Sequence, residues 1–295
     1  MPDRSLTIEA PAKVNLYLGV HDQKDERGYH RVDSVMAAVD VCDTVQITPA
    51  EALTVATVPQ GDCPMERNTA YRAAVALGEA FGRTPAFTIS ITKRIPFCAG
   101  LGGPSTDAAA VLLGLCRLWE IDPADPRIDR IARGIGADVP FFLHGALGYY
   151  DGGGDVLAEE FEPFAGTPVV LVKPEHAKVS TVEAYRTFDA SPATAAPLEP
   201  MLDALRANDR IRVLAQVGNN LGGIACKLEP QIAQVMAWLR AQQGTGVVEV
   251  CGSGACVFAT CDSPATAQRI AREVPADKDW WSCATEFSGG RAISF

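Results

Sequence analysis

The sequence lacks several features that mark common classes of protein. No apolar run is long enough to span a bilayer, and the first twenty residues contain acidic side chains and no secretory leader pattern. Basic residues are in deficit, with 26 Lys and Arg against 36 Asp and Glu. The resulting net charge of −10 argues against non-specific binding to nucleic acid or to an anionic membrane. We therefore expect a cytoplasmic protein with no nucleic-acid or membrane partner.

A metal-binding or disulfide framework is also missing. The nine cysteines include no CxxC pair, and Cys251, Cys256 and Cys261 have no histidine at zinc-finger spacing. Their number is odd and they are spread through apolar segments, which is typical of reduced, buried thiols. We expect no metal held by protein ligands alone. His21, His144 and His176 have no evident partners and are expected to be structural or surface residues.

Hydrophobic periodicity divides the chain into two parts. Alternation or short apolar runs predict strands, at residues 5–20, 34–41, 44–48, 51–57, 86–92, 169–172, 247–250, 255–260 and 280–287. Helical spacing predicts helices at 68–81, 105–120, 126–134 and 265–274, with 180–242 mainly helical. A polar loop is expected at 21–33 and a hairpin or turn at 147–157, which contains the glycines 152–154. Strands with two helices, followed by helices with a small sheet, indicate an α+β fold.

The segment from Ile95 to Leu115 contains the clearest functional signal. Gly100, Gly102 and Gly103 separate a strand-like run from a strongly helical one, and Pro104 fixes a φ at which a helix can begin. A glycine loop that leads into a helix N-terminus binds anions, because unpaired amides and the positive end of the helix dipole point the same way. The loop is neither a Walker A motif nor a Rossmann fingerprint. It is interpreted as a phosphate site, with a simple tight turn as the alternative.

Five segments in order identify a family resemblance. These are PAKVNLYLGV, GYH, GLGGPSTDAAA, GADVPFF and CGSGACVFA, and together they resemble the GHMP kinase superfamily over nearly the whole chain. The resemblance implies a two-domain α+β fold, with domains at 1–157 and 158–295 and an active site in the cleft between them. It is closest to members that use ATP to phosphorylate a tertiary hydroxyl of a cytidine diphospho-sugar-alcohol, in isoprenoid precursor synthesis by the non-mevalonate route.

The resemblance implies that Asp138 and Lys13 are catalytic. A carboxylate can orient an attacking hydroxyl and accept its proton, although Asp138 could also be a solvated side chain or a helix cap. A lysine beside it would keep the carboxylate ionised and stabilise charge at the reacting centre. Asn15 lies two residues beyond Lys13 and so on the same strand face, where it could bind substrate or Asp138.

On the acceptor side, the resemblance assigns cytidine recognition to Tyr29 and His30, with Tyr185 closing the other face of the base. From the residues alone, a Tyr-His pair in a polar loop would be interpreted as two surface residues without a function in binding. The remaining expected substrate contacts are Ser180, Thr181, Gly252 and Ser253. The turn Gly252–Gly254 could otherwise be a plain tight hairpin.

The nucleotide side is expected to use the glycine loop and its neighbours. These residues are Asn68, Pro96, Gly100, Leu101, Gly102, Gly103, Pro104, Ser105 and Thr106. Ser105 would supply a hydroxyl to the phosphates or to Mg²⁺, which would enter with ATP and be held mainly by phosphates. Asn68 is equally well explained as a helix N-cap. Pro104 departs from the family pattern and removes one amide donor, and Asp107 must not face the triphosphate without a cation between them.

Three rival functions remain open at this point. One is another kinase of the superfamily, of the homoserine or mevalonate type, which would not need a cytosine pocket. Another is a non-catalytic nucleotide-binding homologue, for which Pro104 is the best argument. The last is a structural domain. The chain is expected to be a monomer or a homodimer.

Overall fold

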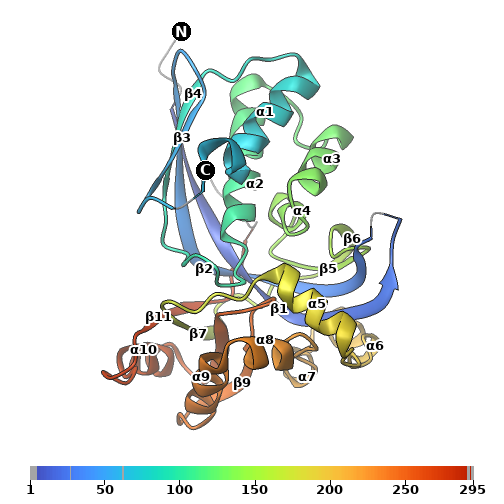
Figure 1. The fold of residues 1–295 in the computed structure, drawn as a ribbon, viewed down its shortest axis with the longest axis vertical. Coiled ribbons are helices and arrows are strands. Elements are labelled where there is room, and N and C mark those ends of the chain that lie inside the picture. Colours follow the sequence, from blue (N-terminus) through green and yellow to red (C-terminus); the bar gives the residue numbers. More distant parts are fainter. Residues whose placement is uncertain (1–4, 27, 62, 291–292, 294–295) are drawn as a thin grey trace.

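The computed structural model describes residues 5–26, 28–61, 63–290 and 293. Two β-sheets form its framework, and helices pack against one side of each sheet (Figure 1). The N-terminal sheet has seven strands and the C-terminal sheet has four. Within the described residues, no helix is both long enough and apolar enough to cross a bilayer.

The N-terminal sheet is built on two long antiparallel strands, β1 (Leu6–Lys24) and β2 (His30–Pro49). Its other strands are β3 (Thr54–Val58), β4 (Phe87–Thr92), β5 (Leu147–Asp151), β6 (Val156–Glu160) and β8 (Gly218–Asn219). The ladder runs β3-β4-β2-β1-β8, while β5 pairs with both β2 and β6. The β1–β2 register shifts at Pro11/Ala12 and at Asn15/Tyr17, and such bulges re-aim side chains.

Four helices cover one side of this sheet (Figure 1). They are α1 (Thr69–Phe81), α2 (Gly103–Trp119), α3 (Pro126–Ile135) and α4 (Val139–Leu143), and the 3-10 turn Met65–Arg67 precedes α1. The longest, α2, packs on β1, β2, α1 and α4. Its alanine- and leucine-rich sequence favours helix and allows close approach to the sheet. Because α2 is buried along most of its length, its N-terminus is held firmly beside Lys13 of β1.

The C-terminal sheet has the order β11-β7-β10-β9 and is antiparallel throughout. Its strands are β7 (Pro168–Pro174), β9 (Thr245–Val250), β10 (Val257–Cys261) and β11 (Trp280–Glu286). The helices of this part are α5 (Thr181–Ala190), α6 (Glu199–Arg206), α7 (Arg210–Ala215), α8 (Gly222–Leu228), α9 (Pro230–Arg240) and α10 (Pro264–Arg272).

Three clusters of buried side chains join these layers. One lies between α1–α4 and the N-terminal sheet, and another between the C-terminal sheet and helices α8–α10. The third joins the two sheets, with Val14 and Leu16 of β1 packed in the same cluster as Leu171 of β7 and Phe258 of β10. Burial of this third cluster fixes β1 between the two halves of the chain.

The structure differs from the sequence predictions at several points. The loop predicted at 21–33 is shorter, because β1 continues to Lys24 and β2 begins at His30, and the predicted strands 34–41 and 44–48 form one strand. Arg27 of that loop lies outside the described residues. Helix α2 begins at Gly103 rather than Ser105, and α4 and β8 were not predicted; β5 and β6 form where a hairpin or turn was expected. The predicted domain boundary at 157/158 falls inside β6, so a division of the chain, which remains a proposal, would fall at 161–167 between the two sheets.

Candidate active site

The glycine loop borders a cavity of about 430 Å³ between the two parts of the chain. Most of the predicted site residues line it. They are Lys13, Asn15, Pro96, Gly100, Leu101, Gly102, Gly103, Pro104, Ser105, Asp138, Thr181, Tyr185, Gly252 and Ser253. The lining residues come from β1, the glycine loop, the start of α2, the N-cap of α4, α5 and the turn before β10, so the fold brings together residues that are far apart in the sequence.

Lys13 and Asp138 meet at this cavity. The Lys13 ammonium lies 3.4 Å from Asp138 Oδ2 and donates to Asn15 Oδ1 at 2.8 Å. Asn15 in turn donates to Ser34 Oγ of β2 at 2.9 Å, which fixes its amide. The lysine is 3% exposed, whereas Asp138 is 35% exposed and open to a ligand. Asp138 stands at the start of α4 but makes no side-chain cap hydrogen bond, so its carboxylate is available for chemistry.

The glycine loop is bound on both sides by backbone hydrogen bonds. Leu101 O accepts from Lys13 N at 3.0 Å, and Ala99 O accepts from Cys256 N at 3.0 Å. A Cβ on Gly100, whose φ is +75°, would lie 2.0 Å from Cys251 O. Only glycine allows so close an approach. The turn Gly252–Gly254 is therefore part of the wall that supports the loop.

The first turn of α2 has the chemistry of a phosphate cradle. Within the described part of the chain, the amides of Gly102 and Gly103 have no protein acceptor, whereas those of Ser105 and Thr106 both donate to Gly102 O at 2.9 Å. Pro104 lies in the first turn, where an N–H would have no partner in the helix. Free amides at the positive end of a long helix fit the phosphates of a nucleotide.

A second cavity, of about 480 Å³, adjoins the first and holds the predicted base-binding residues. Tyr29, His30 and Tyr185 line it, and Thr181 and Tyr185 border both cavities. The His30 and Tyr185 ring centroids are 5.3 Å apart at an angle of 38°. Thr181 Oγ1 is 3.1 Å from Ser253 Oγ, which links α5 to the turn before β10.

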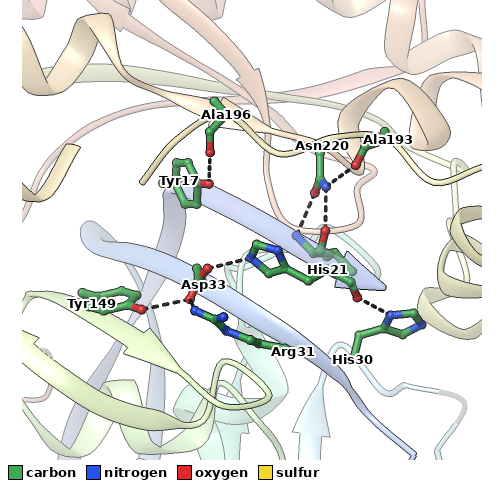
Figure 2. Close-up of polar contacts among 10 residues, drawn as sticks. Tyr17, His21, His30, Arg31, Asp33, Tyr149, Ala193, Ala196 and Asn220 are labelled. Carbon is green, nitrogen blue, oxygen red and sulfur yellow. Dashed lines mark hydrogen bonds and ion pairs between the residues drawn. The ribbon is translucent and has the colours of Figure 1, made fainter. Parts of the chain in front are cut away.

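Figure 2 shows how His30 is held. Its Nδ1 lies 2.7 Å from His21 O and must donate to it, because a carbonyl oxygen only accepts. The His21 ring is fixed in turn by Asp33, with 2.6 Å between Nε2 and Oδ2. Asp33 also accepts from Tyr149 Oη at 2.9 Å. His21 is thus a structural residue, as expected, and it supports the His30 ring.

Three predicted site residues lie elsewhere. Asn68 is the N-cap of α1, accepting from Ala70 N at 2.9 Å, which is the alternative already given for it. Thr106 is fully buried and its Oγ1 has no hydrogen-bond partner among the described residues, so its side chain does not reach the cavity. Ser180 is exposed and caps α5 through Glu183 N. The site roles of all the predicted residues remain proposals.

Several residues at the site were not predicted. Gly153 and Gly154, expected only to form a turn, line the first cavity. Behind the glycine loop, the Lys93 ammonium makes ion pairs with Asp43 and, at 2.5 Å, with Asp107 Oδ2. It also lies 3.4 Å from the position that a Cβ of Gly103 would take. The sequence analysis required a cation between Asp107 and the triphosphate. The cation that Asp107 contacts is the Lys93 ammonium.

The Asp43–Lys93–Asp107 cluster carries two carboxylates for one ammonium. Burial raises the pKa of Asp107 to about 7, against the opposing effect of Lys93 and with the help of Asp43. The folded protein therefore binds a proton at Asp107 that the unfolded chain has released by pH 5, since the ordinary pKa of this group is 3.8. The contribution of this protonation to the free energy of unfolding is fully present below the unfolded pKa of 3.8. It is lost as the pH rises through about 7.

The substitution Asp107→Asn should remove this pH dependence. We expect the wild type to lose free energy of unfolding between pH 5.5 and 8.5, by at most about 1.4 kcal/mol per pH unit, and the variant to lose less. Urea unfolding at three pH values measures the difference, with the exposed Asp277→Asn as control. Parallel curves for wild type and Asp107→Asn would contradict the assignment.

Comparison with known proteins agrees with this geometry. The GHMP kinases N terminal domain matches residues 68–146, and the GHMP kinases C terminal domain matches residues 201–278. A 4-diphosphocytidyl-2-C-methyl-D-erythritol kinase of Bacillus pumilus is 35% identical over 264 residues, covering 89% of this chain and 90% of that protein. The chain belongs to the 4-diphosphocytidyl-2-C-methyl-D-erythritol kinase family. The kinase of the same name from Paramagnetospirillum magneticum is 36% identical and covers 94% of this chain and 96% of its own.

Solved structures agree with membership of this kinase family. A crystal structure of 4-(cytidine 5'-diphospho)-2C-methyl-D-erythritol kinase is 34% identical, with a TM-score of 0.76, and covers 96% of this chain and 100% of its own. Homoserine kinase from Cytophaga hutchinsonii has the same TM-score at 19% identity, covering 100% of this chain and 98% of its own. The second likeness shows the fold alone. The predicted two-domain GHMP kinase fold, α+β in class, is thus confirmed.

Proposed function

We propose that this chain transfers the γ-phosphoryl group of ATP to the 2-hydroxyl of 4-diphosphocytidyl-2-C-methyl-D-erythritol. The observation that carries the proposal is the position of the Lys13–Asp138 pair. It lines the cavity of the glycine loop, which adjoins the cavity of Tyr29 and His30. A phosphate cradle, a paired carboxylate and a base-sized pocket therefore follow one another, in the order that a two-substrate transfer requires.

In this proposal Asp138 orients the acceptor hydroxyl and accepts its proton as the oxygen attacks phosphorus. The Lys13 ammonium stabilises negative charge at the reacting centre, where exclusion of water strengthens the interaction. The Gly102 and Gly103 amides and the Ser105 side chain hold the phosphates of ATP. Mg²⁺ supplies charge neutralisation when it enters with ATP. The transfer forms one O–P bond and breaks another, and no residue needs to form a covalent intermediate.

The acceptor would lie in the second cavity. Tyr29 and Tyr185 offer aromatic faces on which a pyrimidine can stack, and His30 offers a ring nitrogen to the base edge. Thr181 borders both cavities and lies 3.1 Å from Ser253 of the first, which suits contacts to the diphosphate or the polyol. A cytoplasmic location and a monomeric or homodimeric state remain predictions.

The direct test is turnover of the purified protein. With ATP, Mg²⁺ and the cytidyl substrate, we expect one ADP and one phosphorylated product per cycle, followed by coupled ADP assay and by phosphorus NMR. Homoserine and mevalonate serve as competing acceptors and should give no product. ADP formation that depends on either of them, or a folded protein that binds ATP without turnover, would overturn the proposal.

A further inference from the structure

The two ring nitrogens of His30 have different surroundings. Nδ1 donates to His21 O, and the network of His21, Asp33 and Tyr149 keeps this arrangement in place (Figure 2). Nε2 is buried in a side chain that is 5% exposed; it has no hydrogen bond of good geometry among the described residues, and the carboxylate of Asp189 lies 3.0 Å from it. The contact with Asp189 therefore meets only part of the hydrogen-bonding capacity of this nitrogen, and a buried polar atom is most stable when that capacity is met in full.

A carboxylate stands beside this nitrogen. Asp189 Oδ1, from the last turn of α5, lies 3.0 Å from His30 Nε2 but without the alignment of a hydrogen bond. The other oxygen, Oδ2, accepts from Lys24 Nζ of β1 at 2.9 Å. Asp189 is 46% exposed, and all three residues border the second cavity. The carboxylate is thus held between two basic side chains while the side chain remains partly exposed at the cavity.

This pair of groups can distinguish pyrimidines. An ionised carboxylate only accepts hydrogen bonds, and cytosine presents an exocyclic amino group, whereas uracil presents a carbonyl oxygen at the same position. Because Nδ1 already carries a proton, a proton on Nε2 makes the ring an imidazolium, and in that form the pair offers a donor beside an acceptor. That pattern matches the ring nitrogen N3 and the amino group of cytosine. Both positions have the opposite hydrogen-bonding character in uracil.

We infer that Asp189 is a specificity-determining residue, whose carboxylate accepts a hydrogen bond from the amino group of a cytosine bound beside His30. The inference rests on the proposed function, because it places the base of the acceptor in the second cavity. Lys24 positions the Asp189 carboxylate and does not itself form a hydrogen bond to the base. The same carboxylate would repel the carbonyl oxygen of a uridine analogue, so discrimination comes from attraction and repulsion together.

The test compares cytidyl and uridyl substrates in the wild type, Asp189→Asn and Asp189→Ala. We expect both variants to lower the cytidyl-to-uridyl ratio of kcat/KM by at least about tenfold, mainly through KM for the cytidyl substrate. KM for ATP should stay within about twofold of the wild type. Glu183→Gln is the matched control, because Glu183 is an exposed acid of the same helix that does not line the cavity. It should leave the ratio unchanged.

A binding measurement separates this inference from the proposed function. Calorimetry with cytidine 5′-diphosphate and uridine 5′-diphosphate needs no turnover. Preference for cytidine that is lost in Asp189→Asn supports the inference even if the wild type fails to transfer phosphate. A wild type that turns over the cytidyl substrate, with a cytidine preference untouched by both substitutions, would refute the role of Asp189 and leave the kinase reaction standing.

Discussion

Replacing Asp138 by alanine is expected to lower kcat by about 10²- to 10⁴-fold, the range that a positioned general base contributes. The carboxylate is open to the cavity, makes no helix-cap hydrogen bond and lies 3.4 Å from the Lys13 ammonium. Its removal takes away the proton acceptor but leaves the glycine loop intact. ATP affinity should therefore stay within about threefold, as measured by calorimetry alongside steady-state rates.

Two further variants sharpen this test. Asp138→Asn keeps the shape and a hydrogen-bond acceptor but cannot take a proton at neutral pH, so its rate should fall nearly as far as that of Asp138→Ala. Asp203→Asn removes a carboxylate from α6, where the side chain is 64% exposed, and should change neither rate nor binding. Full activity in Asp138→Asn would exclude proton transfer to this residue.

Local sequence patterns predicted much of the fold because they depend on periods of two or 3.6 residues. Helices α1 and α3 begin within one residue of their predicted starts, each behind a side-chain cap, Asn68 or Asp125. Strand β8 has only two residues and pairs with β1 from a distant part of the chain, so no local hydrophobic periodicity can predict it. The polar ends of β1 and β2 are held by their pairing with each other, which a single-segment pattern does not show.

Part of the candidate site could likewise be predicted from local sequence, and part could not. The glycine loop could be interpreted from composition alone, since glycines before a strong helix imply free amides. Lys13 and Asp138 are 125 residues apart, and only family resemblance joined them before the structure placed them together. The sequence did not predict a role for three charged residues, Asp43, Lys93 and Asp189, because isolated charged residues in polar or alternating segments normally face solvent. Their roles depend on tertiary contacts. Asp43 and Lys93 are buried together, and Asp189 lies beside His30 Nε2.

The substitution Lys13→Met should lower kcat by about 10²- to 10³-fold, as expected for loss of one preorganised electrostatic group in a closed site. Methionine retains much of the buried stem that packs beside Gly102, so the fold should survive, and a thermal unfolding curve checks this. Lys13→Arg keeps the charge, but its larger planar head needs room beside Gly102, where the ring of Phe142 already packs, so only partial recovery is expected.

A double-variant cycle decides whether Lys13 acts through Asp138. If the ammonium serves mainly to hold and balance that carboxylate, its removal costs little once the carboxylate is gone. The rate of Lys13→Met/Asp138→Ala should then lie close to that of Asp138→Ala alone. If the two losses multiply instead, Lys13 stabilises the transferring phosphoryl group independently, and the 3.4 Å contact between the two side chains is not the basis of its effect.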